Sequence, residues 1–450
     1  MIGKRSALLG KLRIKPAWSP LRLALGKHTR IAIVGVWAVA SLVCYVSFAN
    51  ELLTATPADF LSFYYASKAL VLGHSAYDRL FLQGLARNDG IGAYVFPYLY
   101  PPIFAVLLRP MTQISVATAH KLWIFGIAGV AGALAALVIY FDAFFAKRCF
   151  KSDKGPRLGA RRSLTSILAL AMLIVHIVPV RNNIAIGQTN LFLVAILGWA
   201  NVAYLQRRRG LSGALAAAVA SVKLTPALLL LFFAARRSRR SIVGFVAGAS
   251  GIMVVTLLLG GLRPWQEYLE FLNQLGPYGS KIPGLFPLAT VWNFSPMGSL
   301  ARVFPREPSV VLLVGTAISL VVVASATLAA ARARDEVAVA FAFAVFCLAP
   351  ILVSSFTYLH HVVFVGPAAA LWLTWAIRLE RSALFLSLVA LLAIAGLNWP
   401  DFYDLIGGPF RTWPALRAVN LYALLALYCV GLVLVFRRGL GYREPGAATP

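Results

Sequence analysis

Long apolar runs limit the folds open to this chain more than any other feature. Ten segments reach or approach the roughly twenty apolar residues that cross a bilayer as a helix: 31–49, 119–146, 163–180, 190–205, 241–261, 309–331, 336–353, 362–377, 382–397 and 415–436. Hydrophobic residues fill 60% of the 450 positions and charged residues only 13%, against about 45–50% and about 25% in average globular chains. The sequence predicts an all-α polytopic membrane protein with about ten full spans.

A further apolar segment, 211–235, is expected to break in its middle. Its halves, LSGALAAAVAS and LTPALLLLFFAA, lie on either side of Lys223, and Pro226 stands near the start of the second half. Each half is too short to cross a bilayer, and proline removes a helical hydrogen bond. We predict a broken hairpin that enters and leaves the membrane on one side.

Clusters of Lys and Arg between the spans predict the orientation of the chain. Most of its 42 Lys and Arg fall on one side of the predicted spans, which the positive-inside rule assigns to the cytoplasm. We expect a basic cytoplasmic N-terminus at 1–30, a single transmembrane domain at 31–436 and a cytoplasmic tail at 437–450, in a bacterial inner (plasma) membrane. The expected external loops are about 50–118, 181–189, 262–308, 354–361 and 398–414.

The net charge of +27 does not indicate nucleic-acid binding, because the basic residues form short clusters between apolar runs. Membrane topology accounts for such clusters. The four cysteines, Cys44, Cys149, Cys347 and Cys429, have no metal-binding spacing, and three of them lie inside apolar runs. We therefore expect no disulfide framework and no metal site, and membrane lipids as the surroundings of the protein.

The polar and aromatic irregularities of the sequence, apart from Lys223, collect in the predicted external segments. Transporters place polar groups and broken helices near the bilayer midplane, with access from both faces. A collection at one face favours an enzyme of the external or periplasmic surface. The chain has no P-loop, no G-x-G-x-x-G between strand and helix, and no G-x-S-x-G, so its activated substrate is expected to arrive in the membrane.

Asp59 is the first candidate catalytic residue, because it is one of few external acids and stands among aromatic rings. It precedes FLSFYYASKALVLG, for which we expect an amphipathic helix that contains Tyr64 and closes at Gly73. A second acid, Asp78, follows this segment. The structural alternative for Asp59 is a helix N-cap, and the two roles are compatible.

Three basic side chains lie in unusual places. Lys223 is the only basic residue of the broken hairpin, and a buried ammonium is costly unless an anion pairs with it. We weigh a ligand phosphate against snorkelling of this side chain to the surface. His360 and His361 end the segment SSFTYLHH, and since adjacent helical residues point about 100° apart, one is expected to face a site while the other packs. The i, i+4 histidine spacing of zinc enzymes is absent.

The segment YVFPYLYPPIFAVLLRPM, 94–111, is apolar but short and rich in proline. We expect a helix that begins at Pro101 or Pro102 and lies partly buried, because proline is tolerated in the first helical turn. Tyr100 stands directly before it. The alternative for the tyrosines of this segment is an interfacial aromatic belt.

Two polar loops supply the remaining candidates. RNNIAIGQTN, 181–190, offers donors and acceptors that suit hydroxyl groups or a phosphate, but it also reads as a plain turn between two helices. The late external loop combines an indole with amide and hydroxyl groups, which suits a sugar ring or an interfacial loop. The candidates from the two loops are Arg181, Gln188, Asn190, Trp292, Asn293 and Ser295.

An ordered set of motifs resembles glycosyltransferase family 87. Along the chain these are Asp59 after the first span, FYYASKALVLGHSAYD, YPP, GQTN, KLTP and a terminal HH at His361. Members of that family are membrane enzymes of the GT-C fold that use polyprenyl-phosphate sugars, typically mannose. Two motifs depart from the family pattern, since the late external loop reads WNFSPMGS and the segment before the histidines reads SSFTYL.

The resemblance implies a GT-C-like fold and an inverting hexosyltransferase of cell-envelope glycan synthesis. The donor would be a polyprenyl-phosphate sugar, in the first place mannose, the acceptor a hydroxyl of a glycolipid or polysaccharide, and a β-linked donor would give an α-linked product. No metal and no cofactor are implied. The implied catalytic residues are Asp59, as general base, with His360 and His361. The residues implied to contact the donor phosphate and lipid are Lys223, Arg181, Gln188, Asn190 and Tyr100. Those implied to contact the sugar or acceptor are Tyr64, Asp78, Trp292, Asn293 and Ser295.

Three other functions stay open at the level of the sequence. A transporter or flippase of lipid-linked sugars would need polar residues through the bilayer, and few are present apart from Lys223. A non-catalytic assembly subunit would tolerate replacement of Asp59, Lys223 and His360 one at a time. A transferase of another sugar, such as arabinofuranose or glucose, has the same sequence features.

Overall fold

The fold was determined as a computed structural model, which describes residues 57–149, 178–275, 284–378, 382–397, 413 and 416–439. Every regular element in these ranges is a helix, and none of them contains a strand. The all-α prediction is thereby confirmed for them. The predicted span 31–49, most of 163–180, and nearly all of the external loop 398–414 lie outside the described residues.

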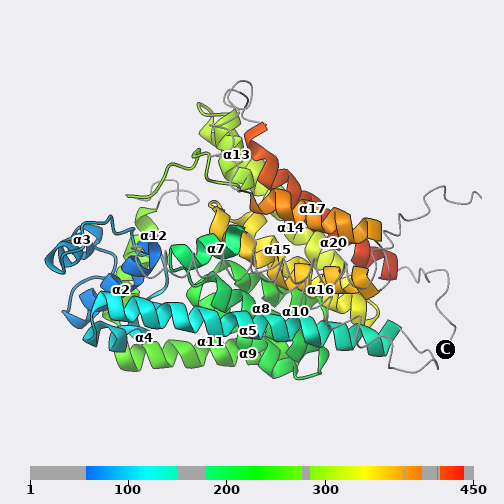
Figure 1. The fold of residues 1–450 in the computed structure, drawn as a ribbon, viewed down its shortest axis with the longest axis horizontal. Coiled ribbons are helices and arrows are strands. Elements are labelled where there is room, and N and C mark those ends of the chain that lie inside the picture. The colour runs from blue at the N-terminus through cyan, green and yellow to red at the C-terminus, as the bar shows by residue number, and fades with distance from the viewer. Residues whose placement is uncertain are drawn as a thin grey trace, which may run out of the picture. The chain divides into compact units, whose positions relative to one another are not determined.

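The helices are α2 Ala58–Val71, α3 Arg79–Asn88, α4 Pro102–Leu107, η1 Arg109–Gln113, α5 Val116–Cys149, α7 Val178–Ala185, α8 Asn190–Leu205, α9 Arg209–Val222, η2 Thr225–Leu228, α10 Leu229–Ala235, α11 Arg239–Gly260, α12 Arg263–Gln274, α13 Pro296–Val303, α14 Pro308–Arg332, α15 Glu336–Val353, η4 Leu359–Val365, α16 Gly366–Arg378, α17 Ser382–Gly396, η5 Leu416–Ala418 and α20 Val419–Gly439. The η elements are 3₁₀ helices. Figure 1 shows them along the chain from blue to red.

Six segments within the described ranges are helical, long and apolar enough to cross a membrane: Val116–Phe145, Arg239–Gly260, Pro308–Arg332, Glu336–Val353, Leu359–Ile377 and Val419–Arg437. Each overlaps a segment that the sequence predicts as a span, so the chain is a multi-pass membrane protein. The predicted number of ten is not confirmed. Two of the other predicted spans form helices of 16 and 15 residues, α8 and α17, which are shorter than a typical full crossing.

The predicted break in the apolar hairpin is confirmed. Helix α9 ends at Val222, and Lys223 follows in an extended conformation with φ −128° and ψ 123°. Pro226 then lies in the short 3₁₀ helix η2, and α10 begins at Leu229. The chain therefore presents the lysine side chain from a non-helical turn between two short apolar helices.

Small residues allow α9 and α11 to pack closely side by side (Figure 1). A Cβ on Gly213 would come within 2.0 Å of the Ser241 carbonyl oxygen, and one on Gly244 within 2.1 Å of the Gly210 carbonyl oxygen. Glycines that let two backbones approach are typical of helix pairs in membranes. This packing supports α9, the helix that Lys223 follows.

Helix α2 forms where the sequence predicts it, but the expected amphipathic character is wrong. Ten of its fourteen residues are buried, and they occur on all sides of the helix. Pro57 is its N-cap and Asp59 lies in its first turn, so the N-cap alternative for Asp59 is wrong as well. A helix that is apolar all round belongs inside a protein.

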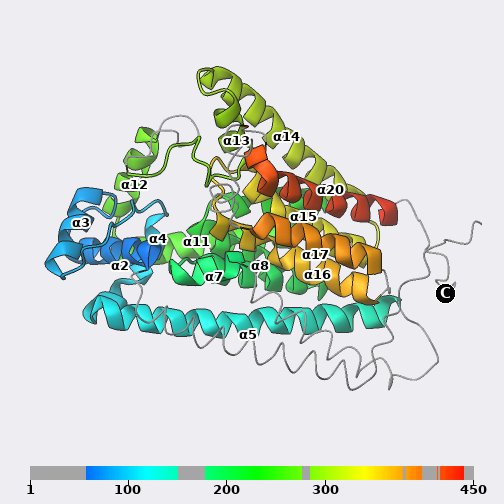
Figure 2. The same ribbon diagram turned by 45° about the horizontal axis from the view of Figure 1, so that its top comes forward.

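The other elements of the candidate site surround the start of α2. Helices α2, α3, α4 and α12 lie together at the left end of Figures 1 and 2, and α5 runs along α8 and α16. Helix α4 begins at Pro102 with Pro101 as its N-cap, as predicted. The α7–α8 turn and η4 pack on one another, so segments far apart in the sequence meet near Asp59.

Candidate active site

The turn between α7 and α8 holds the first turn of α2. The backbone N–H groups of Asp59 and Phe60 both donate to the Ile186 carbonyl oxygen, at 3.0 and 3.2 Å. Gly187 follows with a φ of +71°, which glycine adopts without strain. The Trp123 indole N–H donates to the Gly187 carbonyl oxygen at 2.9 Å and ties α5 to the same turn. These contacts fix the backbone that carries Asp59.

The carboxylate of Asp59 accepts a hydrogen bond from the neighbouring residue of that turn. The Gln188 side-chain Nε2 donates to Asp59 Oδ2 at 2.8 Å. The Oε1 atom of the same amide accepts from the Tyr100 hydroxyl at 3.0 Å. Gln188 is buried, whereas Asp59 and Tyr100 are half-buried. Asp59, Gln188 and Tyr100 thus form one hydrogen-bonded chain across three segments.

The surroundings of Asp59 make its carboxylate more basic than an ordinary aspartate. Burial raises the pKa of Asp59 to about 6, although the Gln188 hydrogen bond and the nearby Lys223 ammonium both act to lower it. A carboxylate with a pKa near the working pH is suited to accept a proton in a reaction. At neutral pH this group is ionised and ready to act as a base.

Lys223 faces the same turn from the α9–η2 junction. Its Nζ atom donates to Asn190 Oδ1 at 2.5 Å, and it lies 5.6 Å from the centre of the Tyr100 ring and 6.0 Å from that of Phe364. An ammonium carries three donors, and among the described residues Asn190 is the one acceptor bonded to it. No ion pair joins Lys223 to Asp59 in the described ranges. Burial lowers the pKa of Lys223 to about 7, although the Asp59 carboxylate acts to raise it, so an anionic ligand beside Lys223 would favour its charged form.

His360 and His361 lie in the first turn of η4, next to Lys223. The His360 carbonyl oxygen accepts hydrogen bonds from the side-chain amides of Asn183, at 2.8 Å, and Asn190, at 2.9 Å. The two imidazole rings have centroids 4.3 Å apart. The Tyr358 backbone N–H donates to His361 Nδ1 at 3.0 Å, so a neutral His361 carries its proton on Nε2. Both histidines are half-buried.

Tyr358 is a site residue that the sequence reasoning did not select. Its ring lies 5.7 Å from the His360 ring and 6.0 Å from the His361 ring. Burial and the Asp59 carboxylate raise the pKa of its hydroxyl, which is buried and has no hydrogen-bond partner among the described residues. The sequence signal that could have selected Tyr358 is its place in SSFTYLHH, two residues before His360. Trp123 and Gly187 were not selected from the sequence either, because the contact between them joins distant parts of the chain.

Three predicted site residues lie away from this cluster or are engaged elsewhere. The Tyr64 hydroxyl donates to the Ile114 carbonyl oxygen at 2.8 Å. Asp78 is exposed and caps α3, where its side chain accepts from the Phe81 backbone N–H. Arg181 is exposed on α7. No contact with a ligand follows from these positions, and their predicted binding roles stay predictions.

Asn293 and Ser295 brace the late external loop against the segment before the histidines. Asn293 is fully buried; its Nδ2 donates to the carbonyl oxygens of Leu288 and Ser355, and its Oδ1 accepts from the N–H groups of Ser295 and Thr357. The Ser295 hydroxyl donates to the Ser355 carbonyl oxygen at 2.7 Å and caps α13. All hydrogen-bonding groups of Asn293 are thus in use. Trp292 precedes them and is half-buried.

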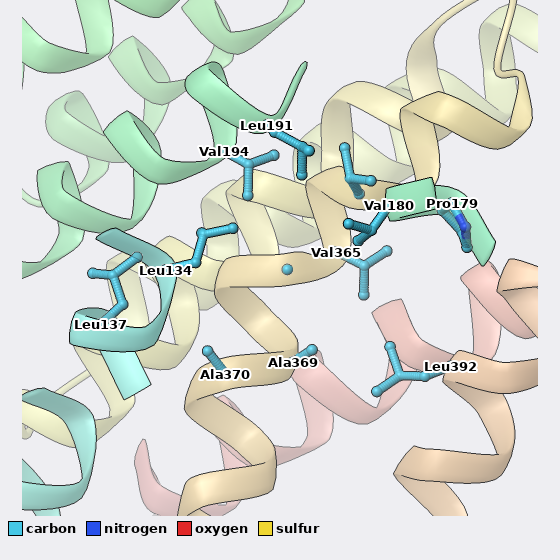
Figure 3. Close-up of a pocket in the computed structure, with 12 residues that line it drawn as sticks. Leu134, Leu137, Pro179, Val180, Leu191, Val194, Val365, Ala369, Ala370 and Leu392 are labelled. Atoms are coloured by element: carbon cyan, nitrogen blue, oxygen red, sulfur yellow. The ribbon is translucent and has the colours of Figure 1, made fainter. Parts of the chain in front are cut away.

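An apolar cavity adjoins the cluster of charged groups. Its lining comes from α5, α7, α8, η4, α16 and α17, and Figure 3 shows the side chains around it: Leu134, Leu137, Pro179, Val180, Leu191, Val194, Val365, Ala369, Ala370 and Leu392. Leu191 directly follows Asn190, and Val363, also in the lining, lies two residues after His361. The polar cluster and the apolar cavity therefore draw on the same helices, α8 and η4.

The chemistry of this arrangement is proton acceptance beside anion binding. Asp59 supplies a base of raised pKa, and Lys223, whose charge acts on that carboxylate, supplies hydrogen-bond donors for an anion. No group of three or more His, Cys, Asp or Glu side chains suited to a metal occurs in the described residues. Of the predicted residues, Asp59, Tyr100, Gln188, Asn190, Lys223, His360 and His361 come together here.

Comparison with protein families gives a match. The profile of Glycosyltransferase family 87 matches residues 98–355, more than half of the chain. The matched region includes Tyr100, the α7–α8 turn and Lys223, and it ends shortly before the histidines.

Relatives of known activity occur in mycobacteria. A polyprenol-phosphate-mannose-dependent alpha-(1-2)-phosphatidylinositol mannoside mannosyltransferase of Mycobacterium tuberculosis is 26% identical over 371 residues, which is 80% of this chain and 81% of the relative. A polyprenol-phosphate-mannose-dependent alpha-(1-2)-phosphatidylinositol pentamannoside mannosyltransferase of Mycolicibacterium smegmatis is 25% identical over 385 residues, 80% of this chain and 85% of the relative. The similarity therefore extends along most of both chains.

Proposed function

The chain belongs to glycosyltransferase family 87 and is a polyprenyl-phosphate-sugar-dependent glycosyltransferase, and we propose that the sugar it transfers is mannose. Two relatives are named for a polyprenol-phosphate-mannose donor and for phosphatidylinositol mannosides as acceptors. The acceptor proposed for this chain is a hydroxyl group of a glycolipid or envelope glycan. The observation that carries the proposal is that Asp59 and Lys223 each bond to a neutral amide near the α7–α8 turn and not to one another.

Asp59 is the proposed general base. Its carboxylate takes the proton of the acceptor hydroxyl while the hydroxyl oxygen forms a bond to the anomeric carbon of the sugar. The bond from that carbon to the phosphate oxygen breaks, and its electron pair leaves with the polyprenyl phosphate. Attack from the face opposite the leaving group inverts the anomeric centre, so a β-linked donor gives an α-linked product.

Lys223 and the histidines are proposed for the phosphate side of the reaction. The phosphate gains negative charge as its bond to the sugar breaks, and a cation held nearby stabilises that charge. Lys223 has hydrogen-bond donors beyond its bond to Asn190. A neutral His361 has its Nε2 proton available, because Nδ1 accepts from Tyr358.

The apolar cavity is proposed to hold the part of the polyprenyl tail next to the phosphate. Its lining includes Leu191, which follows Asn190, and Val363, two residues after His361. Almost all of the side chains around it are aliphatic (Figure 3). A tail in this cavity would leave its phosphate beside Lys223. Burial of isoprene methylene and methyl groups there would contribute binding free energy, about 0.8 kcal/mol for each CH₂ group.

We place the reaction at the external face of the plasma membrane, with both termini in the cytoplasm. The distribution of Lys and Arg between the spans supports this orientation. The external location is tested with Arg87→Cys in a background without the four native cysteines. Arg87 is exposed on α3. Labelling in intact cells by a membrane-impermeant maleimide supports the external location, whereas labelling only after lysis contradicts it.

The function is tested by transfer of labelled mannose from synthetic polyprenyl-phosphate-mannose in membranes that contain the wild type, Asp59→Asn or Asp89→Asn. Asp89 is a matched control, since it is an acid near α2 that pairs with Lys68 at 2.6 Å. We expect transfer by the wild type and Asp89→Asn and a loss of roughly 10²- to 10⁴-fold in Asp59→Asn. NMR of the product should show an α-linkage.

One result of this experiment, and one of its repetition with other sugar donors, would contradict the proposal. Equal transfer by Asp59→Asn would remove Asp59 from the mechanism. Transfer from polyprenyl-phosphate-arabinofuranose or polyprenyl-phosphate-glucose, with none from the mannose donor, would keep the glycosyltransferase and replace the sugar.

A further inference from the structure

Two amides of one turn present opposite ends to two opposite charges. Gln188 and Asn190 are two residues apart at the start of α8. Gln188 turns its NH₂ group to the Asp59 carboxylate, at 2.8 Å, whereas Asn190 turns its carbonyl oxygen to the Lys223 ammonium, at 2.5 Å. Each charge therefore has a neutral partner of matching polarity, and the two charges do not bond to one another.

The orientation of the Gln188 amide follows from a backbone donor. The Thr189 N–H lies 3.3 Å from Gln188 Oε1, and an amide N–H can only donate. The atom that faces it must accept, so the NH₂ group faces Asp59. The Tyr100 hydroxyl donates to the same oxygen at 3.0 Å and strengthens this arrangement.

The orientation of the Asn190 amide follows from the histidine segment. Its Nδ2 donates to the His360 carbonyl oxygen at 2.9 Å, and a carbonyl oxygen can only accept. The remaining Oδ1 faces Lys223. Asn190 is fully buried, so the packing around it prevents a rotation that would exchange the two ends.

A direct bond between Asp59 and Lys223 would weaken both groups for the reaction. An adjacent cation typically lowers the pKa of a carboxylate by about 1–3 units, which would make Asp59 a poor base at neutral pH. The same bond would also occupy the charge that a phosphate needs. The neutral amides of Gln188 and Asn190 bond to one charge each without neutralising it.

We propose that Gln188 and Asn190 are positioning residues that keep Asp59 and Lys223 apart, so that one turn maintains a free base for the acceptor hydroxyl and a free cation for the donor phosphate. This inference rests on the proposed function for the identity of the two ligands. It replaces the expectation from the sequence that these amides bind the donor themselves. Neither amide touches the reacting atoms in this assignment.

The groups that face Asp59 from the surrounding elements are Gln188 from the α7–α8 turn, Lys223 from the α9–η2 junction, Tyr100 from the segment before α4, and Tyr358 from the start of η4. Of these, Gln188 donates a hydrogen bond to the carboxylate, and Lys223 acts on it through its charge. Burial raises the pKa of Asp59 and the Gln188 hydrogen bond lowers it. Without that hydrogen bond the pKa of Asp59 rises, so the carboxylate takes up its proton at a higher pH.

The first test is the pH dependence of kcat/KM for the wild type and for Gln188→Leu, which keeps the size and removes the donor. We expect the inflection near pH 6 to move up by about one unit, as loss of a hydrogen bond to a charged group predicts. Tyr100→Phe should give a smaller shift in the same direction. A residue with only a structural role would lower the rate at every pH, so an inflection that stays in place or moves down overturns the proposal.

The second test examines the role of Asn190 in donor binding separately from the role of Gln188. Asn190→Asp places a carboxylate on Lys223, and we expect the KM for the donor to rise at least tenfold with a smaller change in kcat. Asn273→Asp is the matched control, because it adds the same charge at an exposed amide on α12 and should leave KM unchanged. A KM for Asn190→Asp within twofold of the wild type overturns the assignment of Asn190.

A third measurement needs no substrate. The infrared C=O stretch of protonated Asp59, identified as the band missing in Asp59→Asn, is titrated in purified wild type and in Gln188→Leu. A midpoint that moves up in Gln188→Leu supports the positioning role even where no mannose is transferred, in which case only the proposed function fails. Mannose transfer together with an unmoved midpoint means that the function stands and this inference fails.

Discussion

The Cβ atom of Phe60 occupies the space that a side chain on Gly187 would need: an added Cβ would lie 2.6 Å from it. Gly187 also has a φ of +71°, which disfavours any side chain. We predict that Gly187→Ala separates the α7–α8 turn from α2, breaks the bonds from Asp59 and Phe60 to Ile186, and lowers transfer at least tenfold. Initial rates in membranes with equal amounts of protein measure the effect.

Gly73 provides the control for this substitution. It has nearly the same φ, +75°, and an added Cβ would meet nothing within 4 Å. Gly73→Ala should therefore carry only the backbone cost of about 1–2 kcal/mol and keep its activity. If the two variants lose activity equally, backbone strain and not the contact with Phe60 explains the role of Gly187.

A second prediction concerns the stability of the protein against pH. Burial raises the pKa of Asp59 in the folded state to about 6 from the usual 3.8, so the folded state binds this proton more tightly than the unfolded state. The stability that protonated Asp59 provides is fully present below about pH 4 and is lost as the pH rises through 6. Asp59→Asn cannot ionise and avoids this loss.

We therefore expect Asp59→Asn to melt at a higher temperature than the wild type at pH 7.5, and the difference to disappear toward pH 4. Thermal unfolding in detergent at several pH values measures it. A wild type that is more stable than Asp59→Asn at pH 7.5 would mean that the ionised carboxylate stabilises the fold. The burial of a functional charge would then carry no cost.

The sequence predicted the helices well because their signals are local. Apolar runs defined α11, α14 and α15 to within about two residues, and Lys223 with Pro226 marked the break in the hairpin. The expected amphipathic character of α2 was wrong, because the burial of this helix on all sides depends on neighbours from α4 and α5. Such neighbours have no signature within the α2 sequence.

The candidate site was predictable as a set of residues but not as an arrangement. GQTN was recognised as polar and assigned to the donor, yet Gln188 bonds to Asp59, 129 positions away, and Asn190 to Lys223, 33 positions away. These pairings depend on how α2, α8 and α9 pack. Asn293 shows the same limit, because its four hydrogen bonds within the loops become visible only in the fold.

A third prediction concerns Lys223. Lys223→Met keeps an apolar stem of similar length and removes the charge, so we expect a higher KM for the polyprenyl-phosphate donor. Loss of a charge-assisted hydrogen bond to phosphate is worth about 1.5–3 kcal/mol, which corresponds to roughly a 10- to 150-fold change in affinity. Steady-state kinetics with varied donor concentration measure it.

Lys68→Met is the matched control, because Lys68 lies on α2 and pairs with Asp89 at 2.6 Å away from the proposed phosphate position. An exposed ion pair contributes little to stability, so donor KM and kcat should both stay near the wild-type values. An unchanged donor KM in Lys223→Met would show that this ammonium does not contact the phosphate.

The last prediction concerns the apolar cavity, which Ala369 lines from α16 (Figure 3). Ala369→Phe fills space that we assign to the tail, and displacement of about two methylene groups costs about 1.6 kcal/mol, roughly tenfold in KM. We expect this increase for a donor with a full polyprenyl tail and not for one whose tail is cut to a methyl group, which leaves room in the cavity. Ala369→Ser, which changes the volume little, should behave as the wild type with both donors. Because both donors present the same phosphate to Lys223, an equal increase in KM for the two would mean that the substitution distorts the cluster around Asp59 and Lys223, and the tail would then have to bind elsewhere.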